Sequence, residues 1–278
     1  MMFFNNYSKP GKGVEKRNPN QPRILTFFDI LPRKIWFLFK LNLINILYSI
    51  PFCIIIMIAI GIVSIPMIGI TQTNVDASNV VKIDIILRLG LTYLYMVFLG
   101  GGPSTAGYLY VIRKTVEERY CWLNSDFFEA YKTNFKRSTL LWIIDFFVFA
   151  LLVVAFEIYG QSEFLVLQCG IVCIGCMYAM MHLYVYQMIF TFELPIRKIL
   201  KNSLLIVIMK APISILFMFL NVIIKIIIPA SIYMKINGFG IAMILILCDV
   251  LFIAPILDFA ENFYIIPMLK KHIGRQPE

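Results

Sequence analysis

Six long apolar blocks, separated by short polar segments, make up most of the chain. Blocks of this length are typical of membrane-spanning helices, which need about 20 apolar residues each. They cover residues 35–70, 81–112, 138–159, 164–192, 202–233 and 238–269. The pattern therefore predicts an all-α, polytopic membrane protein with six transmembrane helices.

The composition supports this interpretation and excludes an ordinary soluble enzyme. Of the 278 residues, 60% are hydrophobic and 15% are charged, whereas soluble domains contain about 45–50% apolar and about 25% charged residues. We expect residues 35–269 to form a six-helix transmembrane domain embedded in the lipid bilayer. Residues 1–34 are expected to form a basic cytoplasmic lead-in with an interfacial start, and residues 270–278 a basic cytoplasmic tail.

The basic residues alternate between the segments that connect the blocks. Lys and Arg number seven in residues 1–34, six in 113–137, three in 193–201 and three in 270–278, against one, none and one in 71–84, 160–163 and 234–237. Cytoplasmic loops of membrane proteins are enriched in Lys and Arg. Both termini and the loop 113–137 are therefore predicted to be cytoplasmic. The same rule accounts for the net charge of +9, so no nucleic-acid partner is expected.

A run of three glycines and a proline, residues 100–103, interrupts the second block. Proline lacks a backbone donor and glycine weakens a helix, which predicts a kink or an unwound segment here. Ser104 and Thr105 are the local side chains able to satisfy the freed backbone groups. Gly102, Pro103, Ser104 and Thr105 are candidates for a substrate or partner site, and a packing kink without a ligand is the alternative.

The cytoplasmic loop 113–137 contains a segment with helical amphipathic spacing. Its aromatic face is formed by Phe127, Phe128, Tyr131 and Phe135, and its basic side chains include Lys132 and Lys136. Aromatic and basic faces on opposite sides suit a helix that lies in the membrane interface. The alternative is a docking helix for a cytoplasmic partner such as an ATPase subunit.

Three charged residues fall inside apolar blocks, at similar depths by helical rise. They are Asp145, Lys210 and Asp249. A lone charge within the bilayer costs at least about 2.5–3.5 kcal/mol, so we expect Lys210 to contact Asp249, Asp145 or both. Such a cluster serves either as structural glue or as a substrate or proton site. Asp258 and Glu261, further along the last block, are expected to meet the cytoplasmic interface or Lys40.

No familiar catalytic constellation is present. The chain lacks a Gly-x-x-x-x-Gly-Lys-Ser/Thr loop, a His-Glu-x-x-His motif and a Gly-x-Ser-x-Gly motif. The two histidines, His182 and His272, are far apart in sequence and are not accompanied by metal-ligand spacing. We therefore expect no enzymatic activity, no catalytic residue, no metal site and no cofactor.

Several stretches resemble the YesL-like membrane proteins, which carry the domain of unknown function 624. The first is LNLINILYSIP at residues 41–51. A longer series runs through GPSTAG at 102–107, YVIRK at 110–114, DFF at 126–128 and YKTNFKRS at 131–138, and the last is NFYIIPMLKK at 262–271. The resemblance implies a plasma-membrane protein of a Gram-positive bacterium.

Members of this family tend to accompany carbohydrate-uptake genes. The resemblance thus implies a non-enzymatic accessory subunit of a binding-protein-dependent, ATP-driven carbohydrate importer, in contact with its permease or ATPase subunits. A small solute transporter or channel is the alternative. It is favoured by the broken second helix and the intramembrane charges, features that transporters place at substrate sites.

Overall fold

The computed structural model describes residues 23–71, 77–160, 165–192, 194–235, 244–245 and 247–273. Every regular element in these ranges is a helix, which confirms the all-α class. The chain divides into two units, Met1–Lys34 and Ile35–Glu278. Helix α1 (Arg23–Thr71) begins in the first unit, where the rings of Phe27 and Phe28 pack edge to face.

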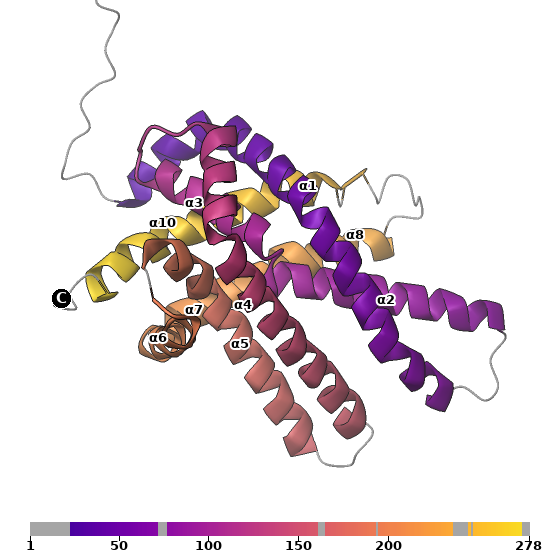
Figure 1. The fold of residues 1–278 in the computed structure, drawn as a ribbon. Coiled ribbons are helices and arrows are strands. Elements are labelled where there is room, and N and C mark those ends of the chain that lie inside the picture. The colour runs from indigo at the N-terminus through magenta and orange to yellow at the C-terminus, as the bar shows by residue number, and fades with distance from the viewer. Residues whose placement is uncertain are drawn as a thin grey trace, which may run out of the picture. The chain divides into compact units, whose positions relative to one another are not determined.

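The second unit contains the remainder of α1 and the other described helices (Figure 1). These are α2 (Ala77–Leu99), α3 (Pro103–Val116), α4 (Leu123–Gly160), α5 (Leu165–Thr191), α6 (Ile196–Met209), α7 (Ala211–Val222), the π-helix η1 (Ile223–Ile227), α8 (Ile228–Lys235), the π-helix η2 (Asp249–Ile253) and α10 (Ala254–Ile273). Helices α4 and α5 run side by side as a hairpin.

Five described stretches are long and apolar enough to cross a membrane, judged by length and composition. They are Leu25–Ile62, Leu123–Tyr159, Leu165–Thr191, Ala211–Ile232 and Asp249–Lys271. The second expected crossing corresponds to α2, whose apolar part, Leu87–Leu99, is shorter. Large apolar side chains such as Leu151 and Val166 are 69% and 83% exposed, as expected for helices whose outer surface faces lipid.

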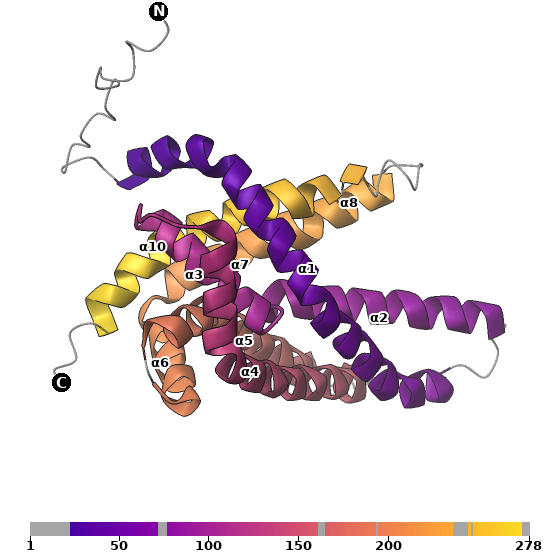
Figure 2. The same cartoon turned by 45° about the horizontal axis from the view of Figure 1, so that its top comes forward.

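Two apolar clusters hold the second unit together. One joins α3, α5, α6 and α10 around the buried side chains of Tyr184, Met188 and Ile265. The other joins α1, α2 and α4 around Tyr95 and Trp142. The rod formed by α7, η1 and α8 runs beside α10 (Figure 2), and the two π-helices lie against each other. Segments of π-helix inside longer helices frequently mark functional sites.

The prediction of a separate interfacial helix in the loop 113–137 is wrong. Residues 123–137 form the first turns of α4, which continues without a break to Gly160. No glycine or proline stands between Leu123 and Tyr159 to end the helix. The connection between α3 and α4 is therefore short, and the aromatic segment is rigidly joined to a membrane-spanning helix.

The expected start of the fifth crossing is also wrong. We placed it near Asn202, but α6 ends at Met209 and a new helix, α7, begins at Ala211. Pro212 explains the break. Its backbone nitrogen has no hydrogen to donate, and its ring would clash with the carbonyl group one turn earlier in a continuous helix. Lys210 therefore lies at the junction between two helices and not inside a membrane-spanning one.

Candidate functional site

The run of glycines between α2 and α3 breaks the second crossing, as predicted. Helix α2 ends at Leu99, and Gly100 and Gly102 have positive φ angles of 79° and 66°. The backbone N–H of Gly101 donates to Thr105 Oγ1 at 2.7 Å, and Ser104 Oγ donates to the carbonyl oxygen of Gly101 at 3.2 Å. Both predicted side chains thus satisfy backbone groups that the break releases.

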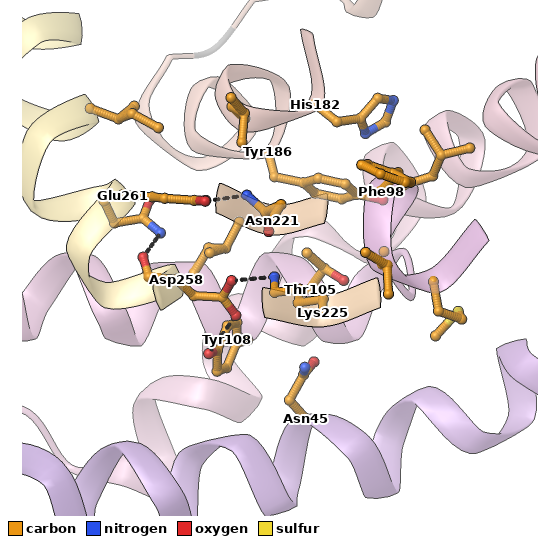
Figure 3. Close-up of a pocket in the computed structure, with 18 residues that line it drawn as sticks. Asn45, Phe98, Thr105, Tyr108, His182, Tyr186, Asn221, Lys225, Asp258 and Glu261 are labelled. Carbon is orange, nitrogen blue, oxygen red and sulfur yellow. Dashed lines mark hydrogen bonds and ion pairs between the residues drawn. The ribbon is translucent and has the colours of Figure 1, made fainter. Parts of the chain in front are cut away.

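A polar cavity of about 140 Å³ adjoins this break (Figure 3). It is lined by α1, α2, α3, α5, α7, η1 and α10, so five of the six apolar blocks contribute a few polar side chains each. The polar lining consists of Asn45, Thr105, Tyr108, His182, Tyr186, Asn221, Lys225, Asp258, Glu261 and Asn262. Of the predicted residues 102–105, only Thr105 lines the cavity, together with Gly100.

An ion pair between Lys225 of η1 and Asp258 of α10 forms one wall of the cavity. Lys225 Nζ lies 2.7 Å from Asp258 Oδ1, and the hydroxyl group of Tyr108 donates to Asp258 Oδ2 at 2.9 Å. Lys225 follows Ala211 by fourteen residues, which corresponds to about 21 Å along the helix. The pair therefore lies well inside a hydrocarbon core of about 30 Å.

A second carboxyl group lies one turn further along α10. Asn221 of α7 donates to Glu261 Oε1, and Asn262 donates to the backbone oxygen of Asp258 at 2.7 Å. Gln187 of α5 in turn donates to Asn262. Three helices are thus bound to one another by side-chain hydrogen bonds around the cavity. Asp258 and Glu261 were expected to meet the cytoplasmic interface or Lys40, whereas their side chains contact Lys225 of η1 and Asn221 of α7.

Three cavity-lining side chains carry buried polar atoms without a hydrogen-bond partner in the described part of the chain. These atoms are Asn45 Oδ1, the hydroxyl oxygen of Tyr186 and both ring nitrogens of His182, of which Nε2 lies at ion-pair distance from Asp145. Buried polar groups are hydrogen-bonded in the great majority of cases, and an exception indicates a bound water, ion or ligand. These atoms therefore mark the cavity as a place that a polar molecule can occupy.

Asp145 is buried, as predicted, but its partners differ from those expected. Tyr178 donates to Asp145 Oδ1 at 2.6 Å, and His182 Nε2 lies 3.0 Å from the same oxygen. Both partners are on α5, one turn apart. From the sequence, His182 was expected to be isolated. It is 37 residues from Asp145 in sequence, and the α4–α5 hairpin brings the two together.

The predicted contact of Lys210 with Asp249 or Asp145 is not among the ion pairs and hydrogen bonds of the described residues. Lys210 is displaced to the end of α6, and Asp249 is 2% exposed with neither carboxylate oxygen hydrogen-bonded to a described residue. Lys225 takes the place that Lys210 was expected to hold. Its signal was present in the sequence, as a lysine between two pairs of isoleucines.

The aromatic face of residues 127–135 packs mostly against protein. Phe127 is fully buried, and the ring of Tyr48 on α1 contacts the rings of Phe127, Phe128 and Tyr131. Phe135 is 40% exposed, and Lys132 and Lys136 are exposed as predicted. The physical reason is Gly107 of α3, whose missing side chain lets the Phe127 ring and backbone approach closely. The segment thus anchors α4 to α1 and α3, contrary to the interfacial interpretation.

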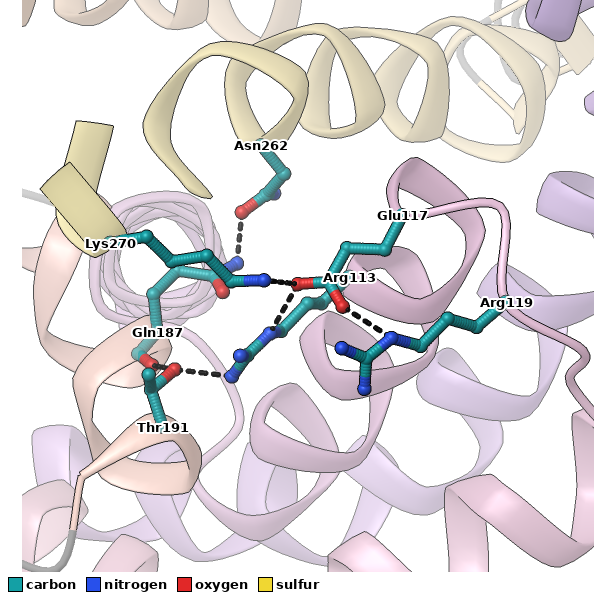
Figure 4. A network of polar contacts seen from close by, with 7 residues as sticks. All are labelled: Arg113, Glu117, Arg119, Gln187, Thr191, Asn262 and Lys270. Atoms are coloured by element: carbon teal, nitrogen blue, oxygen red, sulfur yellow. Dashed lines mark hydrogen bonds and ion pairs between the residues drawn. The ribbon is translucent and has the colours of Figure 1, made fainter. Parts of the chain in front are cut away.

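The C-terminal ends of α3, α5 and α10 meet in a polar network (Figure 4). Glu117 accepts from Arg113 at 3.0 Å, from Arg119 at 2.8 Å and from Lys270 at 2.8 Å. Burial raises the pKa of the Glu117 carboxyl group, but the hydrogen bonds from Lys270 and Arg113 outweigh it and hold this pKa below its ordinary value. Arg113 also donates to Thr191 at the end of α5 at 2.6 Å.

Long apolar helices around a polar centre define a multi-pass α-helical membrane protein. Residues 85–156, which run from α2 through α3 into α4, match the model of the family described as "Protein of unknown function, DUF624". The resemblance drawn from the motifs at residues 102–138 is thereby confirmed for this part of the chain. Comparison with curated proteins and with solved structures found no match.

Proposed function

We propose that this protein binds a small polar solute in the cavity between its helices and carries it across the membrane. The observation that supports this proposal is the cavity itself, which combines a broken helix, a buried Lys225–Asp258 pair and polar atoms without partners. Transporters commonly build substrate sites from discontinuous helices near the middle of the bilayer. Ionisable residues at this depth are costly and are usually functional.

The lining indicates a hydroxylated and uncharged solute. Lys225 and Asp258 compensate each other, which leaves the amide of Asn45 and those oxygens of Asn221 and Glu261 that are outside their mutual hydrogen bond to bind hydroxyl groups. A cavity of about 140 Å³ is close to the one of about 150 Å³ that holds benzene. A small polyol, or the part of a sugar that enters the cavity, fits this space.

Transport by the purified protein in lipid vesicles tests the proposal. We expect saturable exchange of radiolabelled erythritol, xylitol or glucose. The variant N45L removes an unpartnered oxygen, so it is expected to fold normally and to reduce exchange at least tenfold. The same substitution at the exposed Asn124, outside the cavity, is the matched control. Absence of saturable exchange for all three probes in folded protein would overturn the proposal.

The accessory role in a carbohydrate importer stays a prediction of the resemblance alone. The experiment above also separates it from transport, because an accessory subunit would not exchange solute when it is reconstituted by itself. Copurification of permease and ATPase subunits with a protein that shows no exchange would favour the accessory role.

We further propose six crossings of a bacterial plasma membrane, with both termini in the cytoplasm. The Lys and Arg pattern supports this topology. The C-terminal ends of α3, α5 and α10, where the second, fourth and sixth blocks end, also meet, as expected if all three ends lie on the same side of the membrane. Exposed Tyr120 and Trp122 lie in the connection that follows α3, and such aromatic residues favour the membrane–water interface.

Cysteine labelling in intact cells tests this topology. In a background without the six native cysteines, single cysteines at Asn74 or Ser162, which lie outside the described residues, are expected to react with a membrane-impermeant reagent. A cysteine at Lys132 is expected to react only after the cells are permeabilised. Labelling at Lys132 from outside would contradict the topology.

A further inference from the structure

The buried pair of Asp145 and His182 stands at the edge of the cavity, which His182 lines. The side chain of His182 is 3% exposed and that of Asp145 is fully buried. His182 lies at the cavity (Figure 3), whereas Asp145 is not among the lining residues. The imidazole ring therefore separates the carboxyl group from the cavity.

The two ring nitrogens of His182 have different surroundings. Nε2 lies 3.0 Å from Asp145 Oδ1, at ion-pair distance but without hydrogen-bond geometry, whereas Nδ1 has neither an ion-pair nor a hydrogen-bond partner among the described residues. A carboxylate partner favours the tautomer with the proton on Nε2. The lone pair of Nδ1 is then available to accept a proton at the cavity.

Other titratable groups surround the pair from three sides. Tyr178 on α5 donates to Asp145, and the hydroxyl group of Tyr95 on α2 donates to the backbone oxygen of Trp142 at 3.0 Å. Tyr186, one turn after His182, also lines the cavity, as do Lys225, Asp258 and Glu261 from the opposite wall. Lys225 is bound to Asp258, so His182 is the basic side chain that the described residues place against Asp145.

We infer that His182 and Asp145 form a proton-binding site that couples solute movement to the proton gradient; this inference rests on the proposed transport function. A hydronium ion in the cavity transfers its proton to His182 Nδ1 and leaves a water molecule. The pair then holds one positive and one negative charge and is neutral overall. On release the proton returns to water as hydronium, and the pair again carries one negative charge.

The change of charge gives the coupling its physical basis. A single negative charge in the bilayer interior costs at least about 2.5–3.5 kcal/mol, whereas in a neutral pair the attraction between the two charges offsets part of the desolvation cost. Unperturbed histidine changes its charge between pH 5 and 8. Protonation of His182 also changes the charge of a side chain that lines the cavity, and we expect the solute to bind the two charge states with different affinity.

The first test is independent of solute. The chain contains two histidines, so the variant H272Q, labelled with ¹⁵N-histidine in lipid nanodiscs, reports the titration of His182 alone by NMR. We expect the ring signals of His182 to respond to pH in wild type, and D145N to alter that response, because the carboxylate of Asp145 lies 3.0 Å from Nε2. A response that D145N leaves unchanged would overturn the inference.

The second test uses vesicles with the same three probes and an imposed pH gradient. Wild-type protein and H272Q are expected to accumulate solute up the gradient. D145N is expected to retain exchange, since Asp145 does not line the cavity, and to lose accumulation at least tenfold. Accumulation by D145N equal to that of wild type would contradict the coupling. If no probe exchanges while His182 titrates as expected, the transport proposal fails and the proton site stands.

Discussion

Replacement of Lys225 by methionine is expected to lower the free energy of unfolding by about 3–5 kcal/mol, the usual cost of removing one partner from a buried ion pair. The variant leaves the carboxylate of Asp258 without its cation, in a side chain that is only 21% exposed. Only the Tyr108 hydroxyl group would remain to donate to its side chain. Glu261, one turn away, adds a second carboxyl group to the same wall.

The measurement is thermal unfolding of the purified protein in detergent, together with the yield of folded protein in the membrane. Lys132 is exposed on α4, so K132M is the matched control and is expected to change neither quantity. The double variant K225M/D258L is expected to recover most of the lost stability, because it replaces both charges with apolar groups. A single variant K225M as stable as wild type would contradict the ion pair.

The double variant also separates a structural role of the pair from a functional one. A pair that serves only to hold η1 against α10 can be replaced by apolar packing without loss of activity. A pair that lines a solute site cannot, since its polar atoms shape the cavity at Tyr108 and Asn221. We therefore expect K225M/D258L to fold and to have lost solute exchange.

The features that were predicted correctly from the sequence are those with a local cause. The break at residues 100–103 follows from glycine and proline chemistry, and Ser104 and Thr105 are the nearest side chains able to satisfy it. The burial of Asp145 follows from its place in an apolar block. These expectations depend on local sequence alone and not on which helices are neighbours.

The contacts between helices could not be predicted in this way. A depth estimate depends on where a helix starts, and Pro212 moved that start from the expected Asn202 to Ala211. The estimate therefore favoured Lys210 and overlooked Lys225. The partner of Asp145 lies on α5 and not on the fifth or sixth block, because the α4–α5 hairpin determines its neighbours.

The aromatic segment of α4 shows a related difficulty. A face rich in aromatic residues suits both the membrane interface and a protein core, and periodicity does not distinguish them. Whether the face packs against protein depends on the space that a neighbouring helix leaves for it. Gly107 of α3 provides that space for Phe127, and Tyr48 of α1 covers the neighbouring rings. The helix-breaker interpretation covers only the glycines at residues 100–102, whereas Gly107 acts in packing.

Replacement of Gly102 by alanine is expected to destabilise the protein by about 1–3 kcal/mol through its backbone alone, the usual cost of a residue held in a sparsely populated conformation. Gly102 has φ 66° and ψ −118° and stands immediately before the first residue of α3. A Cβ atom there would also lie 3.2 Å from Trp142 Cβ. The rim of the cavity, at Gly100 and Thr105, would shift with it.

Gly90 supplies the matched control within the same crossing. It lies inside α2, and a Cβ atom added there would meet no other atom within 4 Å. Alanine is favoured over glycine in a helix by about 0.5–1 kcal/mol, so G90A is expected to leave the melting temperature unchanged or to raise it, while G102A lowers it. If G102A were as stable as G90A, residue 102 would have to adopt an ordinary helical conformation. Helices α2 and α3 would then form one continuous helix, and the cavity would lose the break that borders it.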